Sequence, residues 1–166
     1  SCSDLLENFG GHTYAAGLSL KEENLDAFTQ RFLKLAADEI IPEQMMPQID
    51  IDAVLDLQDI NAKFMSELKK MNPFGPDNQK PVFCSLGVKD YGTSKLVGKD
   101  LEHIKLELID DKSNTPIHGI AFGMHQHNTH IKNMKPFNIC YTIEENTYNG
   151  NTSLQLMVKD IKENDI

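Results

Sequence analysis

A glycine–histidine segment near the start of the chain carries the residue types best suited to chemistry. It reads Phe-Gly-Gly-His-Thr-Tyr-Ala-Ala-Gly over residues 9–17. Gly10 and Gly11 let the backbone turn tightly and approach a ligand, because neither has a Cβ in the way. His12 follows at once, and the small residues after it allow close packing. We expect this segment to hold the imidazole of His12 against an anionic group such as a phosphate.

Three further histidines are spaced like metal ligands. His125, His127 and His130 form an HxHxxH pattern. A zinc site needs a fixed tetrahedral ligand set held by hydrogen-bonded supporting groups. The residues between these histidines are Gln, Asn and Thr, which are typical of a polar loop. The pattern therefore favours a solvated loop, and we predict no metal site in this chain.

The cysteines do not indicate a cross-linked fold. Cys2, Cys84 and Cys140 are odd in number, widely spaced and without a CxxC pair. This pattern fits small buried thiols in a reducing cytoplasm better than a disulfide framework or structural zinc. No run of about 18 apolar residues occurs, so we predict no membrane-spanning helix.

Charge is unevenly distributed along the 166 residues, whose formal net charge is −9. Residues 1–79 hold six basic and fourteen acidic side chains, whereas residues 80–166 hold ten and eleven. Electrostatic binding of nucleic acid requires a basic surface, which the total charge disfavours. The near-neutral second half permits a local basic groove.

Helical periodicity dominates the first half of the chain. Apolar residues recur at helical spacing between residues 25 and 40, and Ser19 with Glu22 forms a capping box before them. Alternation over residues 48–57 predicts a strand with acidic residues outward. Asp59 is placed to cap a second helix, which ends before Asn72 and Pro73.

From residue 82 onward the hydrophobic period changes to two. Strands are predicted over residues 82–91, 103–109, 117–122, 137–143 and 154–158. Asn149 and Gly150 between the last two predict a hairpin, because a type I′ turn needs positive φ at both central positions. Several short strands in under 90 residues favour a small antiparallel barrel of the OB type, so the expected fold class is α+β.

Two motifs and the order of the strands resemble known proteins. Residues 9–17 resemble the GGHxxAAG signature of the DHHA1 domain in DHH-superfamily phosphoesterases. Residues 73–81 resemble the PFGxGNxxP element of RecJ-type single-strand-specific exonucleases, with Asp77 where that family often has glycine. Segments from residue 97 to residue 161 are similar, in order and spacing, to the C-terminal barrel of RecJ-type proteins.

The resemblance implies a domain organisation and an activity. Residues 1–47 would be the C-terminal part of a DHHA1 domain, and residues 82–166 would form the OB-type barrel. Residues 48–81 would connect the two through a strand, a helix and the proline-containing linker. The parent would be a cytoplasmic exonuclease that degrades single-stranded DNA from the 5′ end in recombination and repair. Its catalytic DHH domain, with the Asp-His-His motif and the Mn or Mg ions, is not in this chain, so the fragment would be inactive alone.

The same resemblance assigns residues to the substrate. His12 would contact the substrate phosphate near the scissile bond as the catalytic residue of this chain, with Gly10 and Gly11 supplying close backbone approach. Single-strand binding also needs cations for phosphates and rings for bases. The expected set for this purpose is Tyr91, Lys95, Lys99 and Lys105.

Two other functions remain open. A barrel that recruits a repair partner, such as a single-strand-binding protein, fits the net charge of −9 and the aromatic content of 7%. A phosphodiesterase acting on short oligonucleotides or cyclic dinucleotides would share the glycine–histidine motif, but such proteins generally lack the added barrel.

Overall fold

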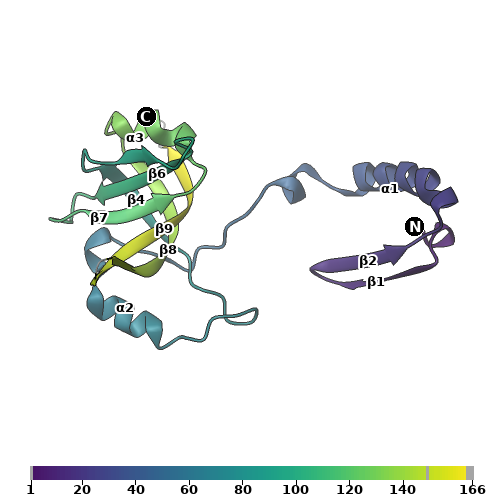
Figure 1. Ribbon diagram of the computed structural model, residues 1–166, viewed down its shortest axis with the longest axis horizontal. Coiled ribbons are helices and arrows are strands. Elements are labelled where there is room, and N and C mark those ends of the chain that lie inside the picture. Colours follow the sequence, from purple (N-terminus) through teal and green to yellow (C-terminus); the bar gives the residue numbers. More distant parts are fainter. Residues whose placement is uncertain (1, 149, 164–166) are drawn as a thin grey trace. The chain divides into compact units, whose positions relative to one another are not determined.

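The computed structural model describes residues 2–148 and 150–163. The chain forms two compact units, Ser1–Ile49 and Asp50–Ile166. Each unit has its own sheet, and the second holds most of the strands (Figure 1). In the described part of the chain, no helix is long and apolar enough to cross a membrane.

The first unit is a hairpin beside a helix. Its elements are a 3₁₀ turn at Ser3–Leu5, β1 (Asn8–His12), β2 (Ala15–Ser19), a 3₁₀ turn at Glu22–Asn24, α1 (Leu25–Glu39) and a 3₁₀ turn at Pro42–Met45. The predicted helix is confirmed, but the predicted capping box is wrong. Ser19 ends β2, where its carbonyl accepts from the backbone N–H of Glu7, and α1 begins after Asn24 without a side-chain cap.

The paired glycines occupy a strand rather than a turn. In the β1–β2 register Gly10 lies opposite Gly17 and Gly11 opposite Ala16. A Cβ on Gly11 would lie 2.7 Å from the carbonyl oxygen of Ala15 and 2.8 Å from Ala16. The tight turn expected at the glycines is therefore wrong. Gly11 is needed because the opposing strand of its own hairpin comes so close.

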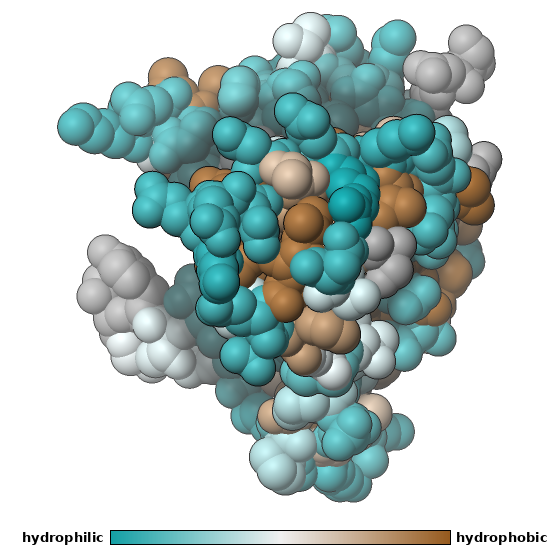
Figure 2. Space-filling view, turned by 90° about the vertical axis from the view of Figure 1, so that its right-hand side faces the viewer, coloured by the Kyte–Doolittle hydropathy of each residue, from teal (hydrophilic) through white to brown (hydrophobic). Residues whose placement is uncertain are grey.

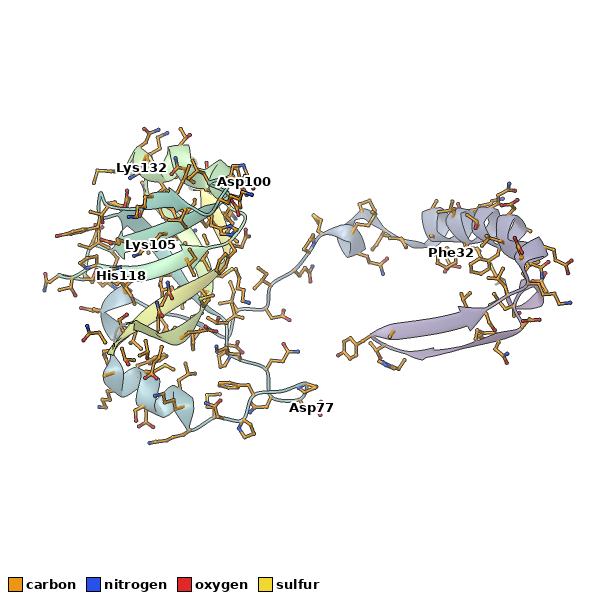
Figure 3. The ribbon with its side chains drawn as sticks, viewed as in Figure 1. Phe32, Asp77, Asp100, Lys105, His118 and Lys132 are labelled. Carbon is orange, nitrogen blue, oxygen red and sulfur yellow. The ribbon has the colours of Figure 1, made fainter. Side chains whose placement is uncertain are left out.

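No described residue of the first unit is buried. Apolar side chains of α1 and of the hairpin, including Phe9, Phe28 and Phe32, instead line an open groove of about 870 Å³. Phe28 and Phe32 both line this groove and stack with ring centroids 5.6 Å apart. Phe32 lies on the helix side that faces the hairpin (Figure 3). Hydrophobic side chains are accordingly visible at the molecular surface between hydrophilic ones (Figure 2).

A connecting segment opens the second unit. It contains β3 (Ala53–Val54), a 3₁₀ turn at Leu57–Asp59 and α2 (Ala62–Lys69). The strand predicted over residues 48–57 is thus only two residues long, and it pairs with β4 in parallel. The cap predicted at Asp59 is also wrong. Asn61 caps α2, its side-chain oxygen accepting from the backbone N–H groups of Lys63 and Phe64.

The large sheet follows. Its remaining strands are β4 (Phe83–Asp90), β5 (Lys95–Val97), β6 (His103–Ile109), β7 (Ile117–Ala121), β8 (Phe137–Tyr148) and β9 (Asn151–Glu163). The order is β3-β4-β8-β9-β7-β6-β5, and β4 pairs additionally with β6. The five predicted strands are confirmed, whereas the short β5 was not foreseen. Asn149 of the predicted hairpin turn lies outside the described residues, although β8 and β9 do pair on either side of it.

The prediction of a wholly antiparallel sheet is wrong. Strands β7 and β9 pair in parallel, as do β3 and β4. The reason is connectivity: a 3₁₀ turn at His125–His127, α3 (Asn128–Lys132) and β8 all intervene between β7 and β9. The chain crosses over and returns in the same direction, as parallel pairing requires.

The core lies inside this second unit, because alternate residues of each strand point inward. Along β6, Ile104, Leu106 and Leu108 are fully buried, and β8 contributes Tyr141 at the same depth. The Tyr141 hydroxyl lies 2.7 Å from Oγ of Ser85, which in turn lies 2.7 Å from the Leu55 carbonyl. Burial raises the pKa of Tyr141 to about 12, so the phenol stays neutral and keeps its hydrogen bond at physiological pH.

Candidate nucleic-acid interface

His12 lies at the end of β1, next to the two residues that turn into β2. Its side chain is exposed, and its Nδ1 accepts from the backbone N–H of Tyr14 at 3.3 Å. An accepting Nδ1 places the proton of the neutral ring on Nε2. Gly10 and Gly11 line the groove beside α1, and His12 is not among the residues that line it. The hairpin therefore presents a donor nitrogen to solvent at its tip.

The expected lysines come from two neighbouring strands of the second unit. In the β5–β6 register, Lys95 lies directly opposite Lys105, so both side chains leave the same face of the sheet. Both are exposed, and within the described residues neither forms an ion pair. Like charges directly opposite each other are destabilising. A shared anion would remove that cost.

The same face continues across β7 and β9. Lys105 lies opposite Ile120, which in turn lies opposite Met157 on β9. In the next row, His118 lies between Glu107 and Gln155. Lys105 and His118 accordingly project from adjacent strands on the same side of the sheet (Figure 3). We call this surface, formed by outward residues of β5, β6, β7 and β9, the outer face.

The other two expected residues lie beside the outer face. Lys99 is exposed in the turn after β5, where Gly98 has φ of 96° and packs against the Glu102 carboxylate. Tyr91 follows β4 and is 51% exposed, with its backbone N–H donating to the Glu107 carbonyl at 2.8 Å. The structure thus brings Lys95 and Lys105 together, whereas Lys99 and Tyr91 belong to adjoining loops.

Sequence reasoning missed an aromatic pair on the outer face. Phe122 follows β7 and is 55% exposed, and it forms a T-shaped pair with His103, with ring centroids 4.8 Å apart and an interplanar angle of 79°. The His103 ring is fixed on both sides. Its Nδ1 accepts from the Gly123 backbone at 3.0 Å, and its Nε2 lies 3.3 Å from Glu102. An exposed ring beside two lysines is the combination that stacks bases and holds phosphates.

A polar recess of about 330 Å³ lies next to these residues. Its lining side chains are Lys105, His118, Asn146, Ser153 and Gln155. Asn146 and Ser153 come from the β8–β9 hairpin, opposite each other in register. Amide, hydroxyl and imidazole groups of this kind donate and accept hydrogen bonds, as the edges of a nucleobase require.

Acidic groups near the outer face are engaged by neighbours. The Glu102 carboxylate accepts hydrogen bonds from its own backbone N–H and from that of Asp100, which keeps its pKa below the usual range. Glu107 accepts from the hydroxyl of Thr93 and lies 3.6 Å from Nδ1 of His118. These carboxylates limit the positive charge of the face.

The HxHxxH cluster is not a solvated loop. His125 and His127 lie in a 3₁₀ turn, and His130 lies in α3. Nδ1 of His127 and Nδ1 of His130 lie 2.8 and 3.1 Å from the two oxygens of Glu163. The predicted loop is therefore wrong, since this short helix docks on the end of β9. Among residues 2–148 and 150–163, no group of three or more His, Cys, Asp or Glu side chains could hold a metal ion.

The proline-rich segment forms a tight turn. The backbone groups of Gly75 and Asn78 bond to each other in both directions, at 2.8 and 3.1 Å. The Asn78 amide also donates to the carbonyls of Met71 and Pro73. Asp77 sits exposed at the tip of this turn.

Comparison with known proteins identifies relatives that cover 95–96% of this chain. A family model described as RecJ OB domain matches residues 51–160. The single-stranded-DNA-specific exonuclease RecJ of Bacillus subtilis is 29% identical over 160 residues, which is 96% of this chain and 20% of that protein. Its counterpart in Salmonella typhimurium is 28% identical over 158 residues, 95% of this chain and 27% of that protein.

The fold is also known. The crystal structure of RecJ in complex with Mn²⁺ from Thermus thermophilus matches with a TM-score of 0.77 and 21% identity, over 100% of this chain and 23% of that chain. The corresponding complex with Mg²⁺ matches with a TM-score of 0.76. The chain spans about a fifth to a quarter of the length of these curated relatives and solved structures.

Proposed function

The chain belongs to the RecJ OB domain family, and on that premise we propose that it is the strand-holding part of a single-stranded-DNA-specific exonuclease. The parent enzyme would degrade DNA from the 5′ end and act in recombination and repair in the cytoplasm. The relatives in B. subtilis and S. typhimurium carry single-stranded-DNA-specific exonuclease in their names. Residues 1–47 would belong to a DHHA1 domain, residues 48–81 to a connector and residues 82–166 to an OB-type barrel.

The strand pairings support the proposed barrel. Strands β4, β8, β9, β7 and β6 pair in that order, and β6 pairs with β4 through Asp90 opposite Leu108 and Lys89 opposite Ile109. In chain order these five strands are β4, β6, β7, β8 and β9, and the short helix α3 comes between the third and the fourth. A five-strand ring with a helix at this place is the arrangement expected of an OB fold. In that fold the second and third strands, here β6 and β7, carry the oligonucleotide-binding face.

The observation that carries the proposal is the composition of the outer face. Lys95 and Lys105 are exposed, opposite each other and without an ion pair in the described part of the chain. The Phe122 ring lies one row away, and the polar recess lies on the other side of Lys105. Such a face offers cations to two phosphates, a ring to one base and hydrogen-bonding groups to another.

The proposed chemistry is divided between this chain and the rest of the parent. His12 would donate from Nε2 to an oxygen of the substrate phosphate, with Gly10 and Gly11 close to the same group. Hydrolysis of the phosphodiester would rely on Mn or Mg ions held by other parts of the parent, since the described residues offer no ligand cluster. The fragment alone would bind DNA without cleaving it.

Salt-dependent binding of labelled single-stranded DNA tests the proposal. The 166-residue chain should bind a short oligonucleotide with an affinity that falls as salt rises, because phosphate contacts release counterions. Lys95→Ala and Lys105→Ala should each weaken binding and reduce the salt slope by about 0.7, the value for one phosphate contact with a single strand. Lys63→Ala, at an exposed lysine of α2, is the matched control and should leave the slope unchanged.

A module that recruits a single-strand-binding protein is the second candidate, favoured by the net charge of −9. No DNA binding at low salt, together with direct binding to such a partner, would decide for it. A nuclease assay completes the comparison. Cleavage by the isolated chain would contradict the placement of the catalytic ions elsewhere in the parent.

A further inference from the structure

Two of the three cysteines face each other across neighbouring strands. In the antiparallel pairing of β4 with β8, Cys84 is the direct partner of Cys140. Neither cysteine is in a disulfide, the Cys140 thiol donates to the Asp160 carbonyl at 3.9 Å, and each residue is 8% exposed. The residues before and after them in this register, Phe83 with Tyr141 and Ser85 with Ile139, belong to the core. Side chains alternate along a strand, so the two cysteines share the opposite face of the sheet.

The backbone hydrogen bonds define the geometry of this pair. The Cys84 carbonyl accepts from the Leu55 backbone N–H at 2.8 Å, so its polar backbone groups point toward β3 and away from β8. Cys84 and Cys140 are consequently a non-hydrogen-bonded antiparallel pair, in which the Cα atoms lie about 4.5 Å apart and the side chains are closest. A disulfide requires a Cα separation of about 4.4–6.8 Å.

We propose that Cys84 and Cys140 are a cross-strand dithiol that closes to a disulfide when the protein meets a hydroperoxide. With hydrogen peroxide, one thiol loses its proton and the thiolate attacks a peroxide oxygen. The O–O bond breaks and the leaving hydroxide takes up that proton, so a sulfenic acid and water result. The opposing thiol then attacks that sulfur, the S–O bond breaks, and a second water leaves. Two thiols are oxidised and one hydroperoxide is reduced. The proposal is independent of DNA binding.

The surroundings favour closure within the chain. Both residues are largely covered, so a small oxidant reaches them more readily than a second protein does. Burial raises the pKa of both thiols, and the neighbouring Asp160 and Cys84 raise that of Cys140 further. The reactive species is the thiolate, so the rate of oxidation should increase with pH above neutrality.

Thiol counting in a Cys2→Ser background provides the test, because Cys2 is the partly exposed third cysteine. The protein is treated with hydrogen peroxide, denatured, alkylated with iodoacetamide and weighed intact. We expect loss of both alkylatable thiols, a cross-linked peptide joining residues 84 and 140 that is lighter by two hydrogens than the two reduced peptides together, and full reversal by dithiothreitol. The product should run as a monomer without reductant.

Three results would overturn the proposal. They are a gain of oxygen atoms on residue 84 or 140 without a cross-link, a cross-link between two chains, and two unmodified thiols at a peroxide dose that oxidises free cysteine. Thermal unfolding gives an independent readout that needs no variant at either position. The cross-linked protein should melt at a higher temperature than the reduced protein, because the bond restricts the unfolded chain. An unchanged or lower midpoint would show that the pair does not fit a disulfide.

Discussion

At the scale of single residues, the outer face owes its character to side chains that only the folded register brings together. Lys95 and Lys105 are ten positions apart in the sequence, and their opposition depends on the three-residue strand β5. The lysines themselves could be predicted as cations of a strand-binding surface. That the two lysines lie opposite each other could not be predicted, because β5 is too short to show the alternation of apolar and polar residues that marks a strand.

Phe122 provides a direct test at this scale. Replacement by alanine removes the exposed ring and should weaken binding of single-stranded DNA by about 1–3 kcal/mol, the usual contribution of one stacked base. Fluorescence anisotropy with a labelled oligonucleotide measures the change. The salt slope should remain as it is, since a ring contributes no phosphate contact.

Leu86→Ala is the matched control for this substitution. Leu86 is a comparably exposed apolar residue of β4, 58% accessible, and lies outside the outer face. Equal losses for the two variants would mean that Phe122 acts through stability or surface hydrophobicity rather than through stacking. Sequence reasoning missed Phe122 because an aromatic residue at a strand end is usually packed, and nothing in the sequence marks this ring as open.

At the scale of elements, local signals predicted which segments are helical or extended better than where they begin. The hydrophobic periods found α1, α2 and five strands, because burial of one face dictates those periods. The two predicted helix caps, at Ser19 and Asp59, are wrong for a physical reason. Ser19 is drawn into β2 by pairing with Asn8, and Asn61 rather than Asp59 meets the free N–H groups of α2. Hairpin pairing and turn geometry outweighed the capping preferences.

Asp110 connects two elements and makes a prediction about stability. Its carboxylate accepts from the backbone of Leu57 at 2.7 Å and from the backbones of Lys112 and Ser113, so it ties the connector to the end of β6. Asp110→Ala should reduce the free energy of unfolding by about 2 kcal/mol, because three backbone donors lose a charged acceptor. Urea unfolding followed by circular dichroism measures it. The exposed neighbour provides the control, and Asp111→Ala should cost about 0.5 kcal/mol or less.

The same carboxylate makes the effect depend on pH. Burial raises the pKa of Asp110, but hydrogen bonds from Leu57, Ser113 and Lys112 lower it more, and the net pKa lies below the usual value of 3.8. A carboxyl group with a lowered folded pKa stabilises the fold above its unfolded pKa and loses that contribution as the pH falls through the folded value. The difference between wild type and Asp110→Ala should therefore be constant near neutrality and shrink below about pH 4. A difference that grows on acidification would contradict this account.

At the scale of the whole molecule, the two units differ in what stabilises them. Every buried residue among those described lies between Leu57 and Ile161, within the second unit. The first unit instead leaves the apolar groove between α1 and its hairpin open. The sequence predicts the apolar face of α1, but it does not predict that this face stays uncovered in the described part of the chain. A hydrophobic period shows which side of a helix is apolar and does not show what packs against that side.

This difference predicts the behaviour of the separated units. Residues 50–166 alone should fold cooperatively and keep the thermal midpoint of the full chain, because they contain the entire described core. Residues 1–49 alone should lack a cooperative transition, since an isolated helix and hairpin without burial are marginal in water. Circular dichroism of both pieces measures this. If residues 50–166 alone do not keep the thermal midpoint of the full chain, the two units stabilise each other.

The position of β9 has a consequence for synthesis. This strand lies between β8 and β7, joining the two through the longest ladder of the sheet and through its parallel pairing. A nascent chain that has emerged from the ribosome only up to residue 150 therefore has one unpaired strand edge on β7 and another on β8. Unpaired edges of this kind invite pairing with other chains. Arrest of translation before β9 emerges would thus leave an aggregation-prone intermediate. Once β9 has emerged, it pairs with both edges.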